Sequence, residues 1–415
     1  MSAPSCDDPH QGGGIDIESA HARIAAALEP VTGVETVGLR AALGRVLAAD
    51  LRTGFDIPPD TNAAMDGYAL RGAELDGDGN ATLRMIGTAW AGHPLERGVE
   101  AGECARIMTG APVPGGADTV VMQERTRADG EWIEIRRGEP GANVRAAGED
   151  LPAGGIALEA GSRIRPAELG VIASLGVTEV AVLRRPRVAV FATGDELHEP
   201  GQALKPGGLY DSNRYTVWAM LTRLGVAVDD RGHLPDDRAA VEASLQSAAA
   251  ENDAIVTTGG VSVGAADHVA VVLREGGDIG FWQITMKPGR PLNFGFFGGA
   301  VMFGLTGNPV SAMVTFYQFV QPSVRALAGC GYRRAPTLRA RTTAAFKKKP
   351  GRTEFQRARL VTAADGMPEV ETVGSQGSGR LSSMARADCF VIIPADSAGI
   401  AAGEWVDVQP FEGVT

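Results

Sequence analysis

The sequence predicts a multidomain α/β protein: a three-layer α/β domain, a β-rich insertion, a small α/β linker domain and a C-terminal domain that resembles a β-barrel. Three observations predict this class. The 415 residues exceed one ordinary hydrophobic core. Residues 187–320 alternate strand-like and helix-like segments, which is typical of a parallel sheet covered on both faces. Residues 53–151 and 336–408 contain short apolar runs separated by Gly and Pro.

The first residues lead into a helix. Residues 1–14 are polar and Gly-rich, without the cationic and apolar parts of a signal peptide, and we expect a disordered lead-in. Apolar residues then recur at helical spacing, and Pro30 closes the predicted helix. A second helix is predicted over residues 39–51, and a short one over 166–175.

The predicted sheet domain has a regular order of elements. Its helix over 212–224 begins at Ser212, a favourable N-cap, and Gly225 follows its end. Strands are predicted over residues 188–192, 254–257, 281–286, 292–297 and 301–305. The other helices are predicted over residues 236–250, 267–273 and 310–320.

The C-terminal region reads as β structure. Asp365-Gly366 is a hairpin signal between strands at 355–361 and 369–373, and residues 405–408 alternate as a last strand. The expected domains are a lead-in (1–14), an N-terminal helix with a linker and dimerisation domain (15–52 and 154–185), the insertion (53–153), the α/β domain (186–333) and the C-terminal β domain (334–415).

Composition excludes several classes. The formal net charge of −11 disfavours wholesale nucleic-acid binding, which needs a basic surface. No stretch reaches the roughly 20 apolar residues of a membrane span. The four cysteines show no C-x-x-C spacing, which predicts free thiols in a reducing compartment, the cytoplasm.

Four loops follow predicted strands or precede predicted helices. Open α/β sheets bind their ligands in loops of this kind, beyond the carboxyl ends of the strands. Glycines let a backbone approach a phosphate, and Lys287 and Arg290 add positive charge. One such loop alone is more often an ordinary turn, but four favour a phosphorylated ligand. None fits the Walker or G-x-G-x-x-G patterns. The candidate ligand-binding residues are Thr193, Gly194, Gly259, Gly260, Ser262, Gly264, Arg290, Gly307, Asn308 and Pro309.

Carboxylates accompany these glycines. Glu196, Asp236 and Asp267 are candidate ligands of Mg²⁺ or another divalent cation, which takes oxygen ligands and shares them with phosphates. Helix capping is an equally good interpretation of Asp236 and Asp267, because both lie at predicted helix starts. The six histidines show no ligand spacing and are interpreted as surface or structural residues.

Two further regions hold polar loops. In the insertion, Asp66, Thr109 and Asp150 lie in polar, glycine-containing motifs that alone are weak signals, for which solvated turns are the simpler interpretation. In the C-terminal region, Arg352, Arg357 and Arg359 are expected on one face of a strand, near the loop 375–380. They predict either a second anion site or a solvated face.

Together these motifs resemble the molybdopterin molybdenumtransferases, the MoeA proteins and the E domain of gephyrin-type proteins. The resemblance runs from about Ile15 to the end, with the motifs in family order. The matching stretches are NAAMDGYA (62–69), RIMTGAPVPGGADTVVMQE (106–124), GED (148–150), ATGDEL (192–197), TTGGVSVGAADHV (257–269), KPGRP (287–291), GLTGNPVSA (304–312), GRTEFQR (351–357) and GSQGSGRLSSM (374–384).

The resemblance implies a homodimeric, four-domain enzyme in which the insertion completes the partner's site. The implied reaction takes adenylylated molybdopterin, molybdate and a divalent cation such as Mg²⁺, releases AMP and leaves molybdenum on the dithiolene. Contacts with the adenylyltransferase and molybdoenzyme chaperones are expected as well. The residues matching catalytic positions of the family are Asp66, Thr109, Asp150, Glu196, Asp236, Asp267 and Lys287; Arg352 and Ser378 match positions linked to molybdate.

The chain departs from the family pattern at Thr306, Gln283, Ala63 and Ala265. Thr306 replaces a common proline and Gln283 an occasional lysine, so both bear on affinity or rate. A non-catalytic molybdopterin carrier or scaffold is the alternative function, against which the retained Asp66, Glu196 and Lys287 argue. The adenylyltransferase of the same sheet fold is disfavoured, because it lacks the insertion and the C-terminal domain.

Overall fold

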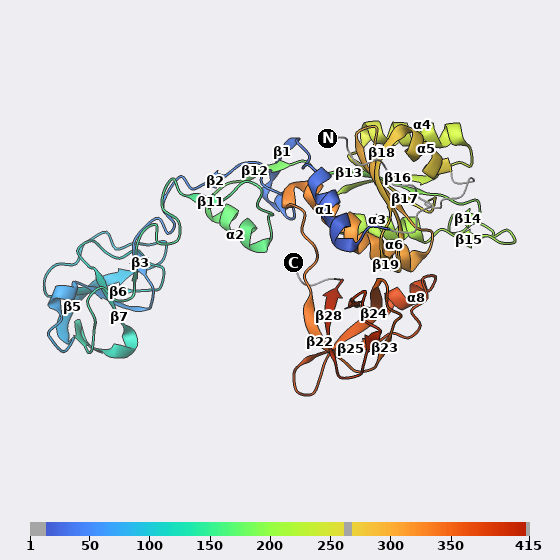
Figure 1. Cartoon of the computed structure of the whole chain (residues 1–415). Helices are drawn as coiled ribbons and strands as arrows, with labels where there is room; N and C mark the ends of the chain where they lie inside the picture. The colour runs from blue at the N-terminus through green and yellow to red at the C-terminus, as the bar shows by residue number, and fades with distance from the viewer. Residues whose placement is uncertain (1–13, 261–267, 412–415) are drawn as a thin grey trace, which may run out of the picture. The chain divides into compact units, whose positions relative to one another are not determined.

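The computed structural model describes residues 14–260 and 268–411 (Figure 1). It contains two compact units. The first comprises the described parts of Met1–Glu35, Gly44–Val46 and Val182–Thr415, and the second comprises Thr36–Leu43 and Leu47–Ala181. The predicted ligand residues Ser262, Gly264 and Asp267 lie outside the described residues.

A six-stranded sheet is the centre of the first unit. Its order is β16 (Ala227–His233), β13 (Arg187–Ala192), β17 (Ala254–Thr258), β21 (Ala300–Leu305), β20 (Pro291–Phe297) and β18 (Gly277–Gln283). The first four strands are parallel, as expected, but β20 runs antiparallel to both of its neighbours, β21 and β18, so the sheet is mixed and not wholly parallel. The cause is the two-residue turn Gly298-Gly299, because both glycines have a positive φ (57° and 90°) and join β20 to β21 as a hairpin.

Helices cover both faces of this sheet, which confirms the three-layer prediction (Figure 1). α3 (Asn213–Arg223) and α6 (Pro309–Thr315) pack with Val188 and Val190 of β13 in one core cluster. On the other face, α4 (Arg238–Glu251) and α5 (His268–Gly276) pack with Ala189 and Phe191. The alternation along β13 therefore divides its side chains between two cores.

The helix predicted over residues 310–320 is longer and irregular. α6 continues through a π-helical turn, η4 (Phe316–Val320), then α7 (Gln321–Arg325) and a second π-helical turn, η5 (Ala326–Cys330). α1 (Ile17–Ala27) buries Ile17, Ala20 and Ile24 in the same cluster as α6, as its helical spacing predicts. His21 is buried there too, and it contacts the hydroxyl of Tyr332 at 2.8 Å.

The C-terminal region forms a closed barrel. Its five strands pair in a ring: β24 (Thr353–Thr362), β25 (Pro368–Thr372), β22 (Leu338–Thr342), β28 (Trp405–Pro410) and β26 (Cys389–Ile393), which pairs again with β24. The predicted hairpin around Asp365-Gly366 is β24 and β25. A short strand, β19 (Met286–Lys287), adds to β24 and thereby connects the barrel with the sheet domain.

The second unit is β-rich, as expected. Its sheet has the order β7 (Thr119–Met122), β4 (Gly67–Leu70), β6 (Glu103–Ile107), β5 (Ala81–Ala89), β9 (Trp132–Ile135) and β8 (Thr126–Asp129). The predicted helix over 166–175 is α2 (Pro166–Ser174). The helix predicted over 39–51 is wrong: only the 3₁₀ turn η1 (Leu39–Ala42) forms, and β2 (Leu51–Arg52) pairs with β11 (Ile156–Leu158). Gly44 ends the turn, because its φ of 80° is unfavourable in a right-handed helix.

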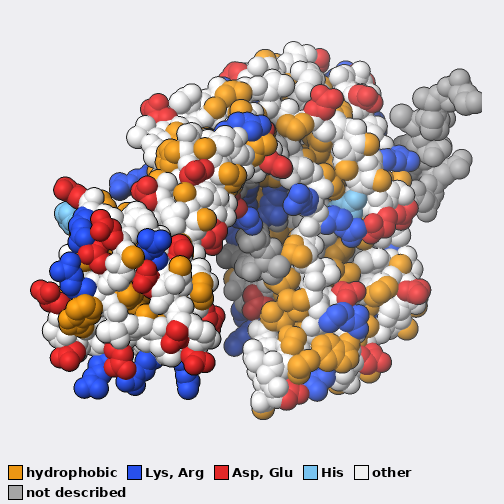
Figure 2. Space-filling view, turned by 90° about the vertical axis from the view of Figure 1, so that its left-hand side faces the viewer, with side chains coloured by type: hydrophobic (Ala, Val, Ile, Leu, Met, Phe, Trp, Pro, Cys, Tyr) orange, Lys and Arg blue, Asp and Glu red, His pale blue; other side chains and the backbone are white. Residues whose placement is uncertain are grey.

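The face of the molecule in Figure 2 carries both acidic and basic side chains. The whole chain has 50 acidic and 39 basic residues. Within residues 14–260 and 268–411, no helix is long and apolar enough to cross a bilayer.

Candidate active site

The predicted glycine loops lie at one edge of the sheet. Ala192, the last residue of β13, pairs with His233 of β16 and with Thr258 of β17, and Thr258 pairs with Leu305 of β21. Four neighbouring parallel strands therefore end at the same level. The loops that follow them carry Thr193, Gly194, Glu196, Asp236, Gly259, Gly260, Gly307, Asn308 and Pro309.

The two central loops touch through their backbones. The N–H of Thr193 donates to the carbonyl oxygen of Thr258 over 3.0 Å, and that of Gly259 donates to the carbonyl oxygen of Leu305 over 2.8 Å. A Cβ at position 259 would lie 2.6 Å from the carbonyl oxygen of Thr193, and Gly259 has a φ of 90°. Only glycine fits both conditions, so the close approach expected from the sequence is present.

The Thr306–Pro309 loop is held from two sides. The Asn213 amide nitrogen, in the first turn of α3, donates to the carbonyl oxygen of Gly307 over 2.8 Å. The N–H of Val310 donates to the carbonyl oxygen of Ser378 over 3.1 Å. The barrel thereby brings Ser378 beside the sheet's binding edge, as the predicted oxyanion role of Ser378 requires.

The Lys287–Arg290 loop lies at the same edge, because β20 runs antiparallel and begins where β21 ends. Lys287 Nζ lies 3.0 Å from Glu354 Oε1; the lysine side chain is 52% exposed, whereas that of Glu354 is 7% exposed. Gly289 is buried against Thr315, and Arg290 is exposed. Lys287 and Arg290 therefore present positive charge to solvent beside the glycine loops.

The predicted metal ligands are two exposed carboxylates in the described chain. Glu196 folds back over its own loop, since a Cβ at Gly194 would meet Glu196 Oε2 at 2.7 Å. Asp236 Oδ1 lies 3.4 Å from His268 Nε2. The capping interpretation of Asp236 is wrong: α4 begins at Arg238, and the side chain of Asp237 accepts from the N–H of Ala240. Asp236 is therefore not used as the helix cap, and its exposed carboxylate contacts only His268 among the described residues.

These two carboxylates suit a divalent cation that also binds phosphate oxygens, because Mg²⁺ often takes only one or two protein carboxylates. In the described part of the chain no three His, Cys, Asp or Glu residues gather as a metal centre. The third predicted ligand, Asp267, is outside that part.

The basic residues of the barrel do not share one face, so that expectation is wrong. Arg352 is exposed in the turn before β24, and Arg359 is exposed on β24, but Arg357 is completely buried. Arg352 precedes the strand, so the alternation of side chains along β24 does not place it on the face of Arg357. Arg357 is covered by the loop that contains Ser375 and Gly377.

Arg357, one of the arginines that the sequence offered for a second anion site, has an unusual environment. Its Nη2 donates to the carbonyl oxygens of Ser375 (3.1 Å) and Gly377 (3.2 Å). Its Nε and Nη1 have no partner among the described residues, and burial lowers the pKa of the guanidinium to about 10. The Arg357 guanidinium has no carboxylate partner among the described residues, and it binds the carbonyl of Gly377, the residue before Ser378. A buried positive charge of this kind is suited to a neighbouring anion. The sequence offered Arg357 through its strand spacing and the GRTEFQR motif, but it did not predict that this arginine is buried.

In the second unit, Asp66 and Thr109 form a pair. The backbone N–H and the hydroxyl of Thr109 both donate to Asp66 Oδ1, over 2.7 and 2.6 Å. These hydrogen bonds lower the pKa of the Asp66 carboxyl, and Arg106 adds to the effect. Asp150 is exposed in a separate loop, and its side chain makes no hydrogen bond or ion pair with described residues. The structure thus brings together two of the three predicted residues of this unit.

Comparison with known proteins places this geometry in a family. Models of the MoeA N-terminal region (domain I and II), a probable molybdopterin-binding domain and the MoeA C-terminal region (domain IV) match residues 15–176, 189–326 and 339–411. A molybdopterin molybdenumtransferase of Haemophilus influenzae is 39% identical over 96% of this chain and 98% of its own. The chain belongs to the MoeA family.

Other members of the MoeA family support this assignment. Molybdopterin molybdenumtransferase 2 of Mycobacterium tuberculosis is 36% identical over 94% of this chain and 98% of its own. A crystal structure of a molybdopterin biosynthesis MoeA protein from Pyrococcus horikoshii superimposes on this chain with a TM-score of 0.82. The two sequences are 29% identical, and the match covers 96% of this chain and all of the Pyrococcus chain. The resemblance and the fold class predicted from the sequence are therefore confirmed.

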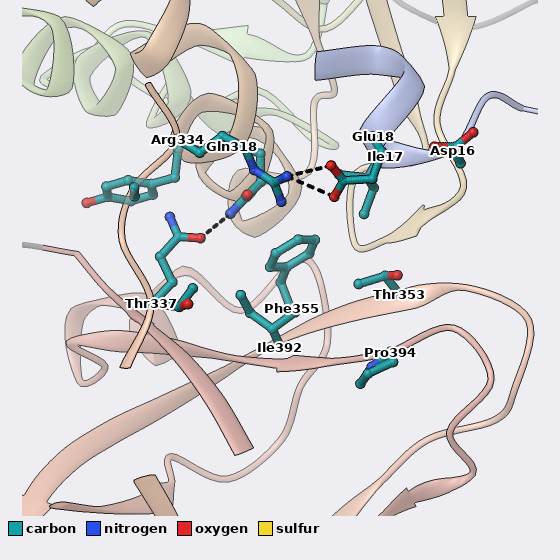
Figure 3. Close-up of a pocket in the computed structure, with 13 residues that line it drawn as sticks. Asp16, Ile17, Glu18, Gln318, Arg334, Thr337, Thr353, Phe355, Ile392 and Pro394 are labelled. Carbon is teal, nitrogen blue, oxygen red and sulfur yellow. Dashed lines mark hydrogen bonds and ion pairs between the residues drawn. The ribbon is translucent and has the colours of Figure 1, made fainter. Parts of the chain in front are cut away.

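A cavity of about 310 Å³ lies away from the glycine loops of this MoeA-family chain, between α1 and the barrel (Figure 3). The Gln318 amide nitrogen donates to Gln409 Oε1 over 2.8 Å in its wall. Glu18 and Arg334 form an ion pair with a nitrogen–oxygen distance of 2.7 Å. None of the predicted site residues lines this cavity.

Proposed function

We propose that this chain transfers molybdenum from molybdate to adenylylated molybdopterin and releases AMP, as a molybdopterin molybdotransferase. The observation that supports this proposal most strongly is the common edge of the sheet, where the glycine-containing loops after β13, β17 and β21 lie beside Lys287 and Arg290. Curated relatives of nearly the same length carry the name molybdopterin molybdenumtransferase.

The glycine loops and the basic pair are suited to bind the pyrophosphate link of this substrate. Gly260 and Gly307 have no side chains, which lets an anion approach the backbone of these loops closely. Lys287 and Arg290 offset phosphate charge and donate hydrogen bonds to it. Pyrophosphate hydrolysis adds water across one P–O–P bridge, so AMP leaves with one new oxygen and the pterin keeps its own phosphate.

Glu196 and Asp236 would hold the divalent cation. Mg²⁺ suits this site because it prefers oxygen ligands. When bound, that cation would offset charge on the phosphates during cleavage. The protein itself holds the carboxylates exposed at the ends of β13 and β16, within the loops that receive the phosphates. Glu354 holds the Lys287 side chain in place through their ion pair, so the ammonium group stays beside the glycine loops.

Molybdate, the second substrate, would bind near the barrel. Arg352 and Ser378 are the predicted ligands, and Arg357 supplies a buried positive charge beside them. A tetraoxo dianion is best bound by guanidinium, hydroxyl and backbone N–H donors. Dependence on molybdate therefore requires the barrel, and pterin binding requires the sheet edge.

Release of AMP tests this function with a matched pair of variants. Adenylylated molybdopterin, molybdate and Mg²⁺ are supplied to the wild type, Glu196→Gln and Asp195→Asn, and AMP is measured. Both residues are exposed neighbours in one loop, but only Glu196 is a predicted ligand. We expect AMP release that needs molybdate, a loss of two or more orders of magnitude in Glu196→Gln, and little change in Asp195→Asn. Tight pterin binding without AMP release by the wild type would instead support a carrier or scaffold.

We further propose a homodimer, as the family resemblance implies. Light scattering on the purified full-length chain, at concentrations spanning two orders of magnitude, measures the mass in solution. A mass near 86 kDa, twice the 43.1 kDa of one chain, is expected. A constant mass of one chain would contradict the dimer without affecting the assignment of the sheet edge.

A further inference from the structure

The first turn of α3 connects the loops that carry the candidate metal ligands. Its buried residue Arg214 is 5% exposed and contacts carboxylates from three separate segments. Its Nε donates to Asp211 Oδ2 over 3.0 Å, its Nη1 to both oxygens of Asp230 over 2.6 Å, and its Nη2 to Glu199 Oε1. All three guanidinium nitrogens are thus engaged.

Each of these carboxylates belongs to an element that leads to the binding edge. Glu199 lies three residues after Glu196, in the loop that follows β13. Asp230 lies in β16, whose end leads within three residues to Asp236. Asp211 directly precedes α3 and also contacts His233 Nε2 at 3.1 Å. One guanidinium therefore joins the segment that follows Glu196 to the strand that leads to Asp236.

Neighbouring contacts extend the connection. The loop of Glu196 is closed by the N–H of Leu209, which donates to the carbonyl oxygen of Glu196 over 2.8 Å. The hydroxyl of Tyr215 donates to Glu199 Oε2 over 2.9 Å. Asn213, next to Arg214, holds the Gly307 carbonyl. A single helical turn thereby contacts the loops after β13 and β21 and the strand β16.

We infer that Arg214 is a positioning residue for catalysis, which fixes Glu196 and Asp236 at the spacing that the cation and the phosphates need. This inference rests on the proposed function. Arg214 cannot contact the substrate itself, because it is buried and its nitrogens are occupied by carboxylates. It acts through Glu199 and Asp230.

Geometry, and not charge alone, is what Arg214 supplies. A planar guanidinium has donors pointing in several fixed directions, whereas a lysine ammonium is a point charge on a flexible stem. Lysine at this position keeps the positive charge, but its single ammonium group cannot replace three guanidinium nitrogens that each bind a different carboxylate. Arg214→Lys therefore separates positioning from simple charge balance.

The test compares Arg214→Lys with Arg45→Lys in the full-length protein. Arg45 is also buried (8% exposed) and pairs with one carboxylate, Glu35, over 2.7 Å, but it contacts none of the loops at the binding edge. Thermal unfolding, steady-state AMP release and hydrogen–deuterium exchange of backbone amides are measured for both. Exchange needs no substrate or metal, so it reports loop order whether or not the proposed reaction occurs.

We expect Arg214→Lys to raise amide exchange in residues 194–199 and 230–236. Its kcat should fall on the order of tenfold or more, with a change in the substrate KM of less than about threefold. Arg45→Lys should lower Tm without either effect. If Arg214→Lys does not fold, Glu199→Gln, which removes one arm of the network, should show the same changes to a smaller degree.

Wild-type loop exchange and kcat in Arg214→Lys would overturn the inference. The inference would also be overturned if Arg45→Lys, at the same Tm, showed the same increase in loop exchange and the same decrease in kcat, because both changes would then reflect general destabilisation. If the wild type releases no AMP, the proposed function fails, and the exchange measurement still decides whether Arg214 orders the two loops.

Discussion

Lys287 of the sheet domain and Glu354 of the barrel form an ion pair, with Nζ 3.0 Å from Oε1. The two residues also pair along their backbones, where β19 joins β24. Glu354 is buried and accepts a second hydrogen bond from the Gln356 amide, so Lys287 is the cationic partner of a largely desolvated carboxylate. The pair links a predicted phosphate-binding residue to the part of the chain that we assign to molybdate.

Replacing Lys287 by methionine should harm both stability and activity. The Glu354 carboxylate would lose its partner, which costs roughly 1–2 kcal/mol of unfolding free energy at such a partly exposed site. The double variant Lys287→Met/Glu354→Gln should regain most of the stability but not the AMP release. Thermal unfolding and AMP release measure the two effects, with Lys347→Met as an exposed control. Recovery of activity in the double variant would refute a direct role for Lys287.

Arg357 should separate function from stability. Because its buried charge lacks a carboxylate, Arg357→Met should leave Tm within a few degrees of the wild type or raise it. The same variant should need on the order of tenfold more molybdate for half-maximal AMP release. Arg359→Met, on the exposed part of the same strand, is the control. A large loss of Tm together with unchanged molybdate dependence would show that Arg357 serves folding only.

The Asp66–Thr109 pair is expected to act in catalysis and not in folding, because both residues are accessible. Asp66→Asn removes the charge but keeps the size of the side chain, and it should reduce kcat by about two orders of magnitude with a small change in Tm. Asp118, whose carboxylate accepts from the N–H of Gly72, lies in the same unit and offers a structural comparison. We expect Asp118→Asn to lower Tm and to leave kcat almost unchanged.

His21 should make the first unit sensitive to acid. Burial, with a smaller contribution from Arg334, lowers the pKa of His21 from 6.5 to about 4. The folded protein therefore favours the neutral ring. Its contribution to stability is complete above about pH 6.5 and is lost as pH falls toward 4, by up to roughly 3 kcal/mol. His21→Gln should flatten the decrease in Tm between pH 7 and pH 4.5. An equal decrease in both proteins would assign the acid sensitivity to other groups.

The sequence predicted the binding edge because local rules decide it. Gly259 and Gly307 follow buried strands, and parallel strands that pair in register must end together. The choice of Asp237 over Asp236 as the cap was beyond sequence reasoning, because the two aspartates are adjacent and a shift of one residue decides the outcome. The helix expected over 39–51 does not extend past Ala42 because Gly44 adopts a positive φ.

Long-range contacts account for what the sequence did not reveal. Arg214 meets Glu199 and Asp230, which lie 15 and 16 residues away in opposite directions, and only the fold brings them together. The burial of Arg357 depends on a loop about 20 residues later in the chain. The domain boundaries and the roles of the site residues stay predictions, for which the variants above are designed.

The most direct test of the central claim is to compare the amount of molybdenum bound to the pterin product with the amount of AMP released. Purified wild-type protein is incubated with adenylylated molybdopterin, molybdate and Mg²⁺, and pterin-bound molybdenum and AMP are quantified in the same sample. The account predicts that both appear in equal amounts, and that neither appears with Glu196→Gln. AMP without pterin-bound molybdenum would show a pyrophosphate hydrolase and not a molybdenumtransferase, and would contradict the assignment of the barrel to molybdate.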